Sequence, residues 1–93
     1  MKYRKKPIEV EAMQFLGPLV NIDYQMMFDD WMLEKEKLGG DKCKGRYIGG
    51  YLKITTLEGI MVANPGDWII CGVKNELYPC ADEIFKATYE EVS

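Results

Sequence analysis

The sequence predicts an α+β fold, in which one long helix packs against a small curved antiparallel sheet or partly open barrel of about five strands, with one short C-terminal helix. Three observations support it. Apolar and polar residues alternate with strand periodicity near both ends of the chain, residues 21–38 carry apolar residues at helical spacing, and Gly, Pro, Asn and Asp clusters separate these segments. Ninety-three residues provide one hydrophobic core, so we expect a single domain, 1–93.

The first element is a strand over residues 8–15. Its apolar residues alternate with Glu9 and Glu11, which indicates one buried and one solvated face. Pro7 is placed at the start or edge of this strand, because proline has no amide hydrogen to give to a ladder. The Gly17-Pro18 pair ends the strand.

The second element is a helix from about residue 21 to residue 38. Asn21 or Asp23 can cap its first turn, and Gly39-Gly40 ends it. Its apolar residues cover more of the cylinder than the one stripe that a helix on a sheet needs. We interpret the surplus either as cover for a sheet edge or dimer seam, or as a docking face for a protein partner. The candidate partner-binding residues are Tyr24, Met27, Phe28, Trp31 and Met32.

A glycine-rich, locally basic segment, residues 39–50, follows the helix and is interpreted as a loop. Its glycine spacing is that of a phosphate-binding P-loop, but Arg46-Tyr47 replaces the Lys-Ser/Thr pair that this motif needs. Lys42, Lys44 and Arg46, with backbone amides, are candidates for holding an anion such as a nucleotide phosphate. The alternative is a mobile linker. Cys43 has no histidine in the chain to act beside it, so we expect no catalytic cysteine.

Residues 51–79 are predicted to form a three-stranded antiparallel meander. In the first strand Leu52, Ile54 and Thr56 share one face, and after a turn at residues 57–59 the second strand covers residues 60–63. Residues 64–67 fit a type II turn, because Pro65 presets φ at the second position and Gly66 accepts the positive φ of the third.

The next strand, starting at Asp67, is an apolar run that suits a central strand buried on both faces, with Trp68 as the expected core anchor. A hairpin at residues 72–75 then reverses the chain until Pro79 ends the return strand. If Cys71 pairs with Glu76, Cys80 lies opposite Asp67, and the two cysteines are too far apart for a disulfide.

The last segment is predicted as a short helix followed by a closing strand. Asp82 can cap the helix, Ile84 and Phe85 are expected to point into the core, and residues 88–92 form the strand. The residues to which we assign a structural role in this C-terminal third are Pro65, Gly66, Asp67, Trp68, Tyr78 and Phe85.

Composition excludes several classes of function. Twelve Lys and Arg against 15 Asp and Glu leave a net charge of −3, which argues against a general nucleic-acid binder. No apolar run approaches the ~18 residues of a membrane span. Three cysteines without a C-x-x-C pair fit reduced thiols in a cytoplasm. Without histidine the chain lacks the commonest metal ligand and general base, so we expect no metal, no cofactor and no enzymatic activity.

Two runs of the chain resemble the short bacteriophage and prophage proteins named for a Pro-Gly-Asp-Tyr-Gly signature. One is the opening, residues 2–15; the other is Pro65-Gly-Asp-Trp-Ile-Ile and the residues that follow it up to Glu90. In this chain Trp68 stands where the signature has tyrosine, and Ile69 where it has glycine. The family has no assigned biochemical function. The resemblance therefore implies a phage gene product in the host bacterial cytoplasm, and it implies no reaction.

The sequence favours a phage accessory protein that binds a host or phage protein, as an inhibitor of a host enzyme or defence complex that acts by surface occlusion. Small size, acidic charge and the strongly apolar helix are the observations behind this interpretation. One alternative is a nucleotide- or anion-sequestering protein that uses the 39–50 loop. A second is a virion or assembly component, and a homodimer is compatible with each of them.

Overall fold

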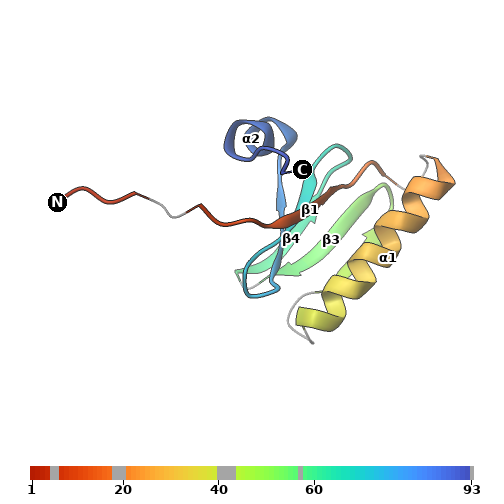
Figure 1. Ribbon diagram of the computed structural model, residues 1–93. Coiled ribbons are helices and arrows are strands. Elements are labelled where there is room, and N and C mark those ends of the chain that lie inside the picture. The colour runs from red at the N-terminus through yellow and green to blue at the C-terminus, as the bar shows by residue number, and fades with distance from the viewer. Residues whose placement is uncertain (5–6, 18–20, 40–43, 57, 93) are drawn as a thin grey trace.

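The computed structural model describes residues 1–4, 7–17, 21–39, 44–56 and 58–92. Figure 1 shows the helices and strands packed together, with the N-terminus far from this body. The predicted α+β class is confirmed. In chain order the elements are β1 (Glu11–Gln14), α1 (Ile22–Gly39), β2 (Gly45–Ile48), β3 (Tyr51–Thr56), β4 (Gly59–Ala63), β5 (Trp68–Cys71), β6 (Leu77–Cys80) and α2 (Asp82–Thr88).

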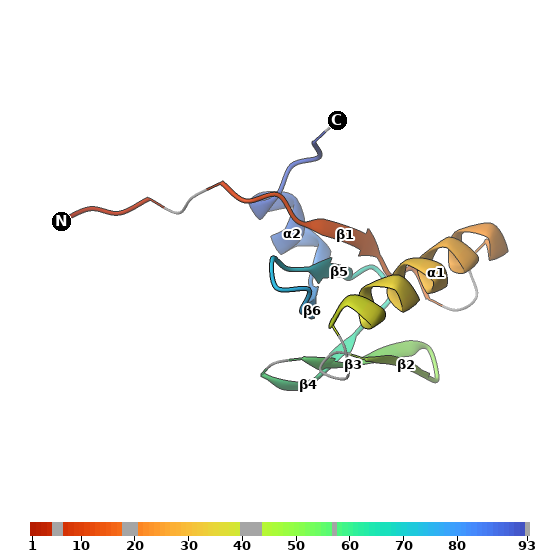
Figure 2. The same ribbon diagram turned by 60° about the horizontal axis from the view of Figure 1, so that its bottom comes forward.

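The strands form two antiparallel sheets of three, in the orders β1-β5-β6 and β2-β3-β4. Figure 2 shows the two sheets as separate layers with α1 at one side. The predicted meander over residues 51–79 is wrong, because β4 pairs with β3 and the turn at residues 64–67 then carries the chain into the other sheet. The single sheet or barrel of about five strands is replaced by this two-sheet arrangement.

Strand β2 lies inside the segment that the sequence predicted as a loop. It pairs with β3 across the Gly49-Gly50 turn. Gly49 has a φ of 59°, a conformation that residues with a Cβ atom rarely adopt. Residues 40–43, which include Lys42 and Cys43, lie outside the described residues. The predicted first strand is also shorter than expected. Strand β1 starts only at Glu11, because its partner β5 offers four residues for pairing.

Helix α1 begins where the sequence placed its cap. The Asn21 side-chain oxygen accepts hydrogen bonds from the backbone amides of Asp23, at 2.9 Å, and Tyr24, at 3.3 Å, so Asn21 is the cap. The Tyr24 hydroxyl donates to the backbone carbonyl of Gln14 at 2.5 Å and thereby ties the first turn to β1. The helix ends at Gly39, as the glycine pair predicted.

The main core lies between the two sheets and α1. Phe15 and Phe28 are both 2% exposed, and their ring centroids are 5.7 Å apart. The buried members of this core are Phe15, Phe28, Met32, Leu52, Ile54, Ala63, Ile69, Cys71 and Leu77.

The Asn64–Asp67 turn has the predicted geometry: the Asp67 amide donates to the Asn64 carbonyl at 2.9 Å, and Gly66 has a φ of 102°.

Trp68 is not the core anchor that the sequence predicted. It lies on the opposite face of the β1-β5-β6 sheet from Ile69 and is only partly buried, stacked on Phe85 of α2 with ring centroids 4.1 Å apart. Its indole N–H donates to Asp82 at 2.8 Å, and this hydrogen bond, followed by one from Lys86, lowers the pKa of Asp82.

Helix α2 corrects three further predictions. Asp82 makes no side-chain capping hydrogen bond, because its carboxylate accepts from Trp68 and Lys86. Ile84 is 60% exposed and does not reach the core. Residues 89–92 form no strand, although Tyr89 stacks on Phe85 and its hydroxyl lies 3.5 Å from that of Tyr78.

The β5-β6 hairpin has one more residue in its loop than predicted. Cys71 faces Leu77 and Cys80 faces Trp68, so the predicted register is shifted by one residue. The Gly72 amide donates to the Glu76 carbonyl at 2.8 Å, and Asn75 takes a φ of 62°, a conformation that asparagine tolerates well. Neither Cys71 nor Cys80 forms a disulfide bond.

An ion pair between a buried lysine and an exposed glutamate joins α1 to β1. Lys35 is only 3% exposed, its ammonium pairs with Glu11, and Glu34 lies 3.6 Å away. The hydrogen bond to Glu11 raises the pKa of Lys35 and outweighs the opposing effect of burial. Lys35 also lies 5.9 Å from the centroid of the Trp31 ring.

Two neighbouring positions on α1 test this description of the core. Phe28→Ala should lower the free energy of unfolding by about 3–5 kcal/mol, because it leaves a cavity beside Phe15. The control Met27→Ala, at a side chain that is 61% exposed, should change it by less than about 0.5 kcal/mol. Urea denaturation followed by circular dichroism measures both. Equal losses for the two variants would contradict this orientation of α1.

Candidate functional site

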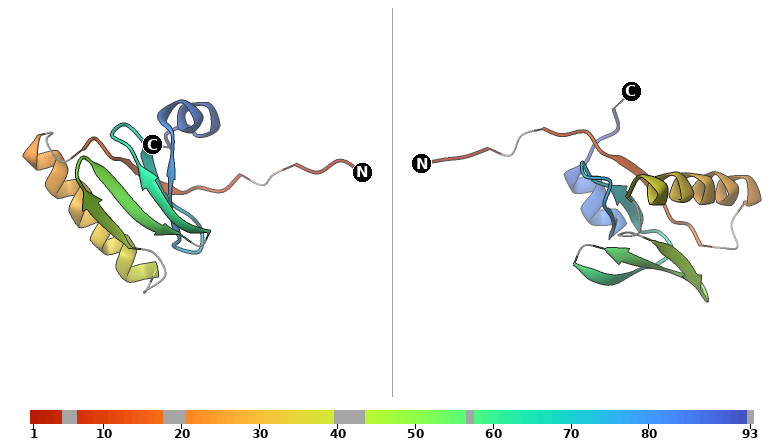
Figure 3. Two further views of the ribbon diagram at one scale, coloured as in Figure 1. Left: turned by 180° about the vertical axis from the view of Figure 1, so that it is seen from behind. Right: turned by 90° about the horizontal axis from the view of Figure 1, so that it is seen from below.

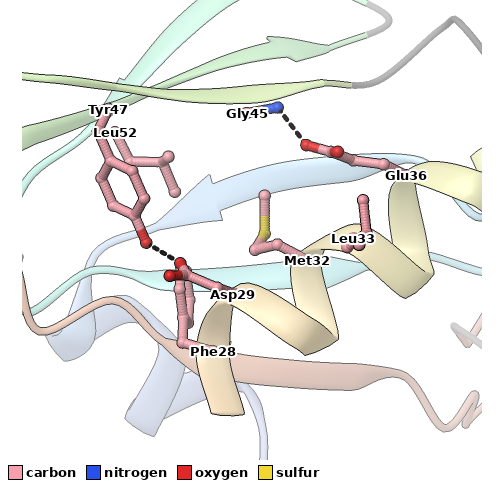
Figure 4. Close-up of a pocket in the computed structure, with 8 residues that line it drawn as sticks. All are labelled: Phe28, Asp29, Met32, Leu33, Glu36, Gly45, Tyr47 and Leu52. Carbon is pink, nitrogen blue, oxygen red and sulfur yellow. Dashed lines mark hydrogen bonds between the residues drawn. The ribbon is translucent and has the colours of Figure 1, made fainter. Parts of the chain in front are cut away.

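An open apolar cleft lies between α1 and the β2-β3 hairpin (Figure 4). Its volume is about 220 Å³. Helix α1 provides one wall, with Met32 and Leu33 pointing toward the strands, and β2 and β3 provide the other through Tyr47 and Leu52. The cleft residues are Phe28, Asp29, Met32, Leu33, Glu36, Gly45, Tyr47 and Leu52.

Two polar contacts span the cleft and hold its walls together. The Tyr47 hydroxyl donates to Asp29, and the Gly45 backbone amide donates to Glu36 at 2.7 Å (Figure 4). A Cβ atom at position 45 would lie 2.7 Å from the terminal methyl of Met32, so a larger residue there requires that flexible side chain to shift. The cleft is lined mainly by apolar side chains, and its rim carries the carboxylates of Asp29 and Glu36.

The rim has a perturbed acid-base group. Partial burial, followed by the hydrogen bond to Asp29, raises the pKa of Tyr47 well above the value of an ordinary tyrosine. At neutral pH Tyr47 is therefore a neutral hydrogen-bond donor. Its partner Asp29 accepts that hydrogen bond, and we identify no nucleophile in the cleft that this pair could activate.

The solvent-facing side of α1 is acidic in the middle and apolar at both borders. At 100° per residue, Ile22, Met26 and Leu33 fall on the border next to the cleft, and Met27 and Leu38 on the opposite border. All five are more than half exposed. Asp23, Asp30, Glu34 and Lys37 lie between them and are exposed as well, so this middle strip carries three carboxylates and one ammonium group. We call these nine residues the α1 outer surface.

The sequence-predicted partner residues divide into three groups. Phe28 and Met32 are buried in the core, so their assignment to a partner surface is corrected: they support the cleft from below. Tyr24 and Trp31 are partly buried and pack against the same core. Met27 is exposed on the α1 outer surface, where its role in binding stays a prediction.

The sequence indicates Phe28 and Met32 but not the other residues that line the cleft. It assigns no role to Leu33, and Tyr47 lies in the segment predicted as a loop. The available signal was the spacing Ile22, Met26 and Leu33, which repeats at four and seven residues and cannot share a face with Phe28. Nothing local in the sequence indicated that Tyr47 would pack beside α1.

Two of the three predicted anion-binding residues lie on the outer face of the β2-β3-β4 sheet, away from α1. Arg46 faces Lys53 across the strands, and the Lys44 carbonyl accepts a hydrogen bond from the Thr55 amide at 2.8 Å. Lys44, Arg46 and Lys53 line a shallow hollow of about 550 Å³ with Thr55 and Ile60. Lys53 was not predicted, and Lys42 lies outside the described residues.

The fold and the cleft define a small α+β protein with an apolar recess and two surfaces of opposite charge. A comparison with protein-family models, with curated proteins and with solved structures gave no match. Among the described residues, no three or more Cys, Asp or Glu side chains are grouped so that they could hold a metal ion. In the same residues, neither helix combines the length and apolar character that crossing a membrane requires.

The raised pKa of Tyr47 predicts a pH dependence of stability. The folded protein holds the phenol proton more tightly than the unfolded chain does. The contribution of this proton to the free energy of unfolding is therefore complete below about pH 10, the pKa of an unperturbed tyrosine, and is lost as pH rises further. As pH rises from about 9 to about 11, the free energy of unfolding measured in urea should fall less for Tyr47→Phe than for the wild type.

Tyr3→Phe, at an exposed position near the N-terminus, is the control and should follow the wild type. Some alkaline sensitivity should persist in Tyr47→Phe, because partial burial also raises the pKa of Tyr78 and the pKa of Lys35 is raised as well. Superimposable curves for Tyr47→Phe and the wild type would show that the Tyr47–Asp29 bond does not distinguish the two protonation states.

Proposed function

We propose that this protein is a non-enzymatic binding protein that docks a protein partner on the α1 outer surface and inserts a partner side chain into the cleft. The observation that carries the proposal is the exposure of five large apolar residues on one helix, beside an open apolar recess. Exposed apolar surface of this kind, rimmed by polar groups, is typical of interaction sites.

The charges of the site specify the chemistry of the partner. Asp23, Asp30 and Glu34 lie between the two apolar borders, and Asp29 and Glu36 rim the cleft. A matching surface would present one apolar side chain for the cleft, flanked by lysine or arginine. Such complementarity raises the rate of association and excludes acidic competitors. The methionines at positions 26 and 27 can repack against different contours.

The biological setting belongs to the same proposal. The resemblance of residues 2–15 and 65–90 to phage and prophage proteins supports a phage accessory factor in the host cytoplasm. Occlusion of a host enzyme or defence complex is the mode of action that fits a small domain whose described surface offers binding groups and no assembled catalytic set. A role in the virion would instead place the protein in purified particles, and mass spectrometry of particles distinguishes the two.

Substitutions at the cleft border test the proposal. Met26→Asp and Leu33→Asp should each weaken partner binding on the order of tenfold or more, because each places a charge where apolar contact forms. The matched control is Ile84→Asp, an equally exposed apolar position on α2. Host proteins retained by the wild type and Ile84→Asp, and lost with both cleft-border variants, identify the partner, and titration of that partner measures the change in affinity. Binding indifferent to Met26 and Leu33 would refute the assignment of this surface.

A second candidate function is the binding of a phosphate-bearing small molecule such as a nucleotide, and the grouping of Lys44, Arg46 and Lys53 on one sheet face favours it. Within the described residues, Arg46 and Lys53 form no ion pair with a carboxylate, so their charges remain available to an anion.

Calorimetry with ATP as the probe tests this second function. The wild type should bind ATP, and the double variant Arg46→Ala, Lys53→Ala should lose on the order of tenfold in affinity, since each cation contributes a charge-assisted hydrogen bond. The control is Lys74→Ala, Lys86→Ala, which removes the same net charge elsewhere. Equal losses for the two double variants would reduce the effect to net charge and reject a specific site.

A further inference from the structure

Strand β4 is an edge strand with none of the usual protection. Within the described residues no strand pairs with its outer side, and its sequence Gly-Ile-Met-Val-Ala contains no charge and no proline. Ile60, Met61 and Val62 are 62%, 39% and 53% exposed. Natural edge strands are normally blunted by charges, prolines or bulges, because an open apolar edge pairs with other strands. We therefore expect another strand to pair with this edge.

The backbone of β4 shows which groups are available at the edge. The Thr55 amide donates to the Lys44 carbonyl, so the backbone of Thr55 points toward β2. Bonding directions alternate along an antiparallel strand, and Thr55 faces Ile60 while Lys53 faces Val62. Ile60 and Val62 therefore exchange no backbone hydrogen bonds with β3. Their amides and carbonyls point to the open edge.

We infer that β4 pairs antiparallel with β4 of a second copy of this chain, about a twofold axis at Met61, so that two sheets join into one of six strands. This register places Ile60 opposite the partner's Val62, and Val62 opposite the partner's Ile60. It satisfies the edge-pointing groups of both residues in both copies, and it brings β-branched side chains together on one face. A twofold axis centred on Ile60, or on Val62, would instead place that residue opposite the same residue of the partner, and the other one would have no such match.

Self-complementarity favours a second copy over a strand from an unrelated protein. A twofold interface needs a patch that matches itself, and a short uncharged strand with apolar residues at symmetric positions does so. The flanking residues are compatible as well, since Glu58 would face the partner's Asn64 instead of another carboxylate. The Lys53 side chains of the two copies would be three strand spacings apart, about 14 Å, beyond the ~8 Å screening length at physiological salt.

Charge complementation tests the pairing and its register. The wild type should elute with twice the 10.7 kDa mass of one chain in light-scattering chromatography. The double variants Ile60→Lys, Val62→Lys and Ile60→Glu, Val62→Glu should each elute as monomers, because like charges then face each other in both pairs. An equimolar mixture of the two should restore the dimer. Ile84→Lys is the control and should stay dimeric.

A cross-linking experiment examines the twofold axis directly. In the inferred register Met61 lies opposite Met61 of the second copy, in a pair that exchanges no backbone hydrogen bonds. The Cα atoms of such a pair are about 4.5 Å apart, which is within disulfide range. Met61→Cys should therefore form a disulfide-linked dimer under mild oxidation, and Ile48→Cys, an exposed position on β2, should not. Two results would overturn the proposal: a monomeric wild type at about 100 µM, or a dimer that persists in the double variant Ile60→Lys, Val62→Lys. The β4 edge would then be left to a strand from another protein.

Discussion

The fold depends on the burial of Phe15, because this one residue joins α1, β2 and the turn between the two sheets. Its ring packs against Phe28 of α1 at 5.7 Å and against Tyr47 of β2 at 6.0 Å. Its backbone amide donates to Asp67 and its carbonyl accepts from Gly66, at 2.8 and 2.6 Å, so the turn that leads from one sheet to the other is fixed to β1. The two views in Figure 3 show the result, with α1 lying beside both sheets. The cleft follows from the same contact, since Phe15 sets how closely α1 approaches β2.

The parts of this structure that the sequence predicts are those with local causes. The Asn64–Asp67 turn needs only Pro65 and Gly66, and the cap at Asn21 needs only its own side chain. Alternation of Leu52, Ile54 and Thr56 places them on one buried face, and the structure agrees. In each case the physical determinant lies within four residues of the feature it controls.

The parts that the sequence does not predict depend on contacts distant in the chain. Trp68 and Ile69 are both large and apolar, and alternation says only that they face opposite ways. Which face becomes the core is decided by α1 and the second sheet on one side and by Phe85 of α2 on the other. Strand β2 was missed because Gly45 and Arg46 weaken its local pattern, and it forms because β3 offers an edge. The candidate site is equally hard to predict from the sequence, because Tyr47 is brought to α1 only by the pairing of β2 with β3.

The surfaces of the protein are chemically distinct although the net charge is only −3. Acidic residues gather on α1, and a basic group lies on the outer face of the β2-β3-β4 sheet, on opposite sides of the strand layer. Average charge therefore conceals two surfaces of opposite local charge, whose electrostatic fields are strong at short range and screened beyond it. The net charge of −3 argues against a uniformly basic nucleic-acid binder, but it says little about either local surface.

The order of strands β2, β3 and β4 also separates the inferred dimer contact from the cleft. The cleft lies at the β2 edge, beside α1, and the open edge is that of β4, two strands away. A dimer formed through β4 would leave both clefts accessible, so that the proposed docking site would be present in two linked copies. Linked sites raise the apparent affinity for a target that is itself oligomeric, provided that the spacing of its sites matches. A chain of 93 residues with a shallow recess would gain most from this arrangement, because one recess of about 220 Å³ buries too little of a partner to hold it tightly alone.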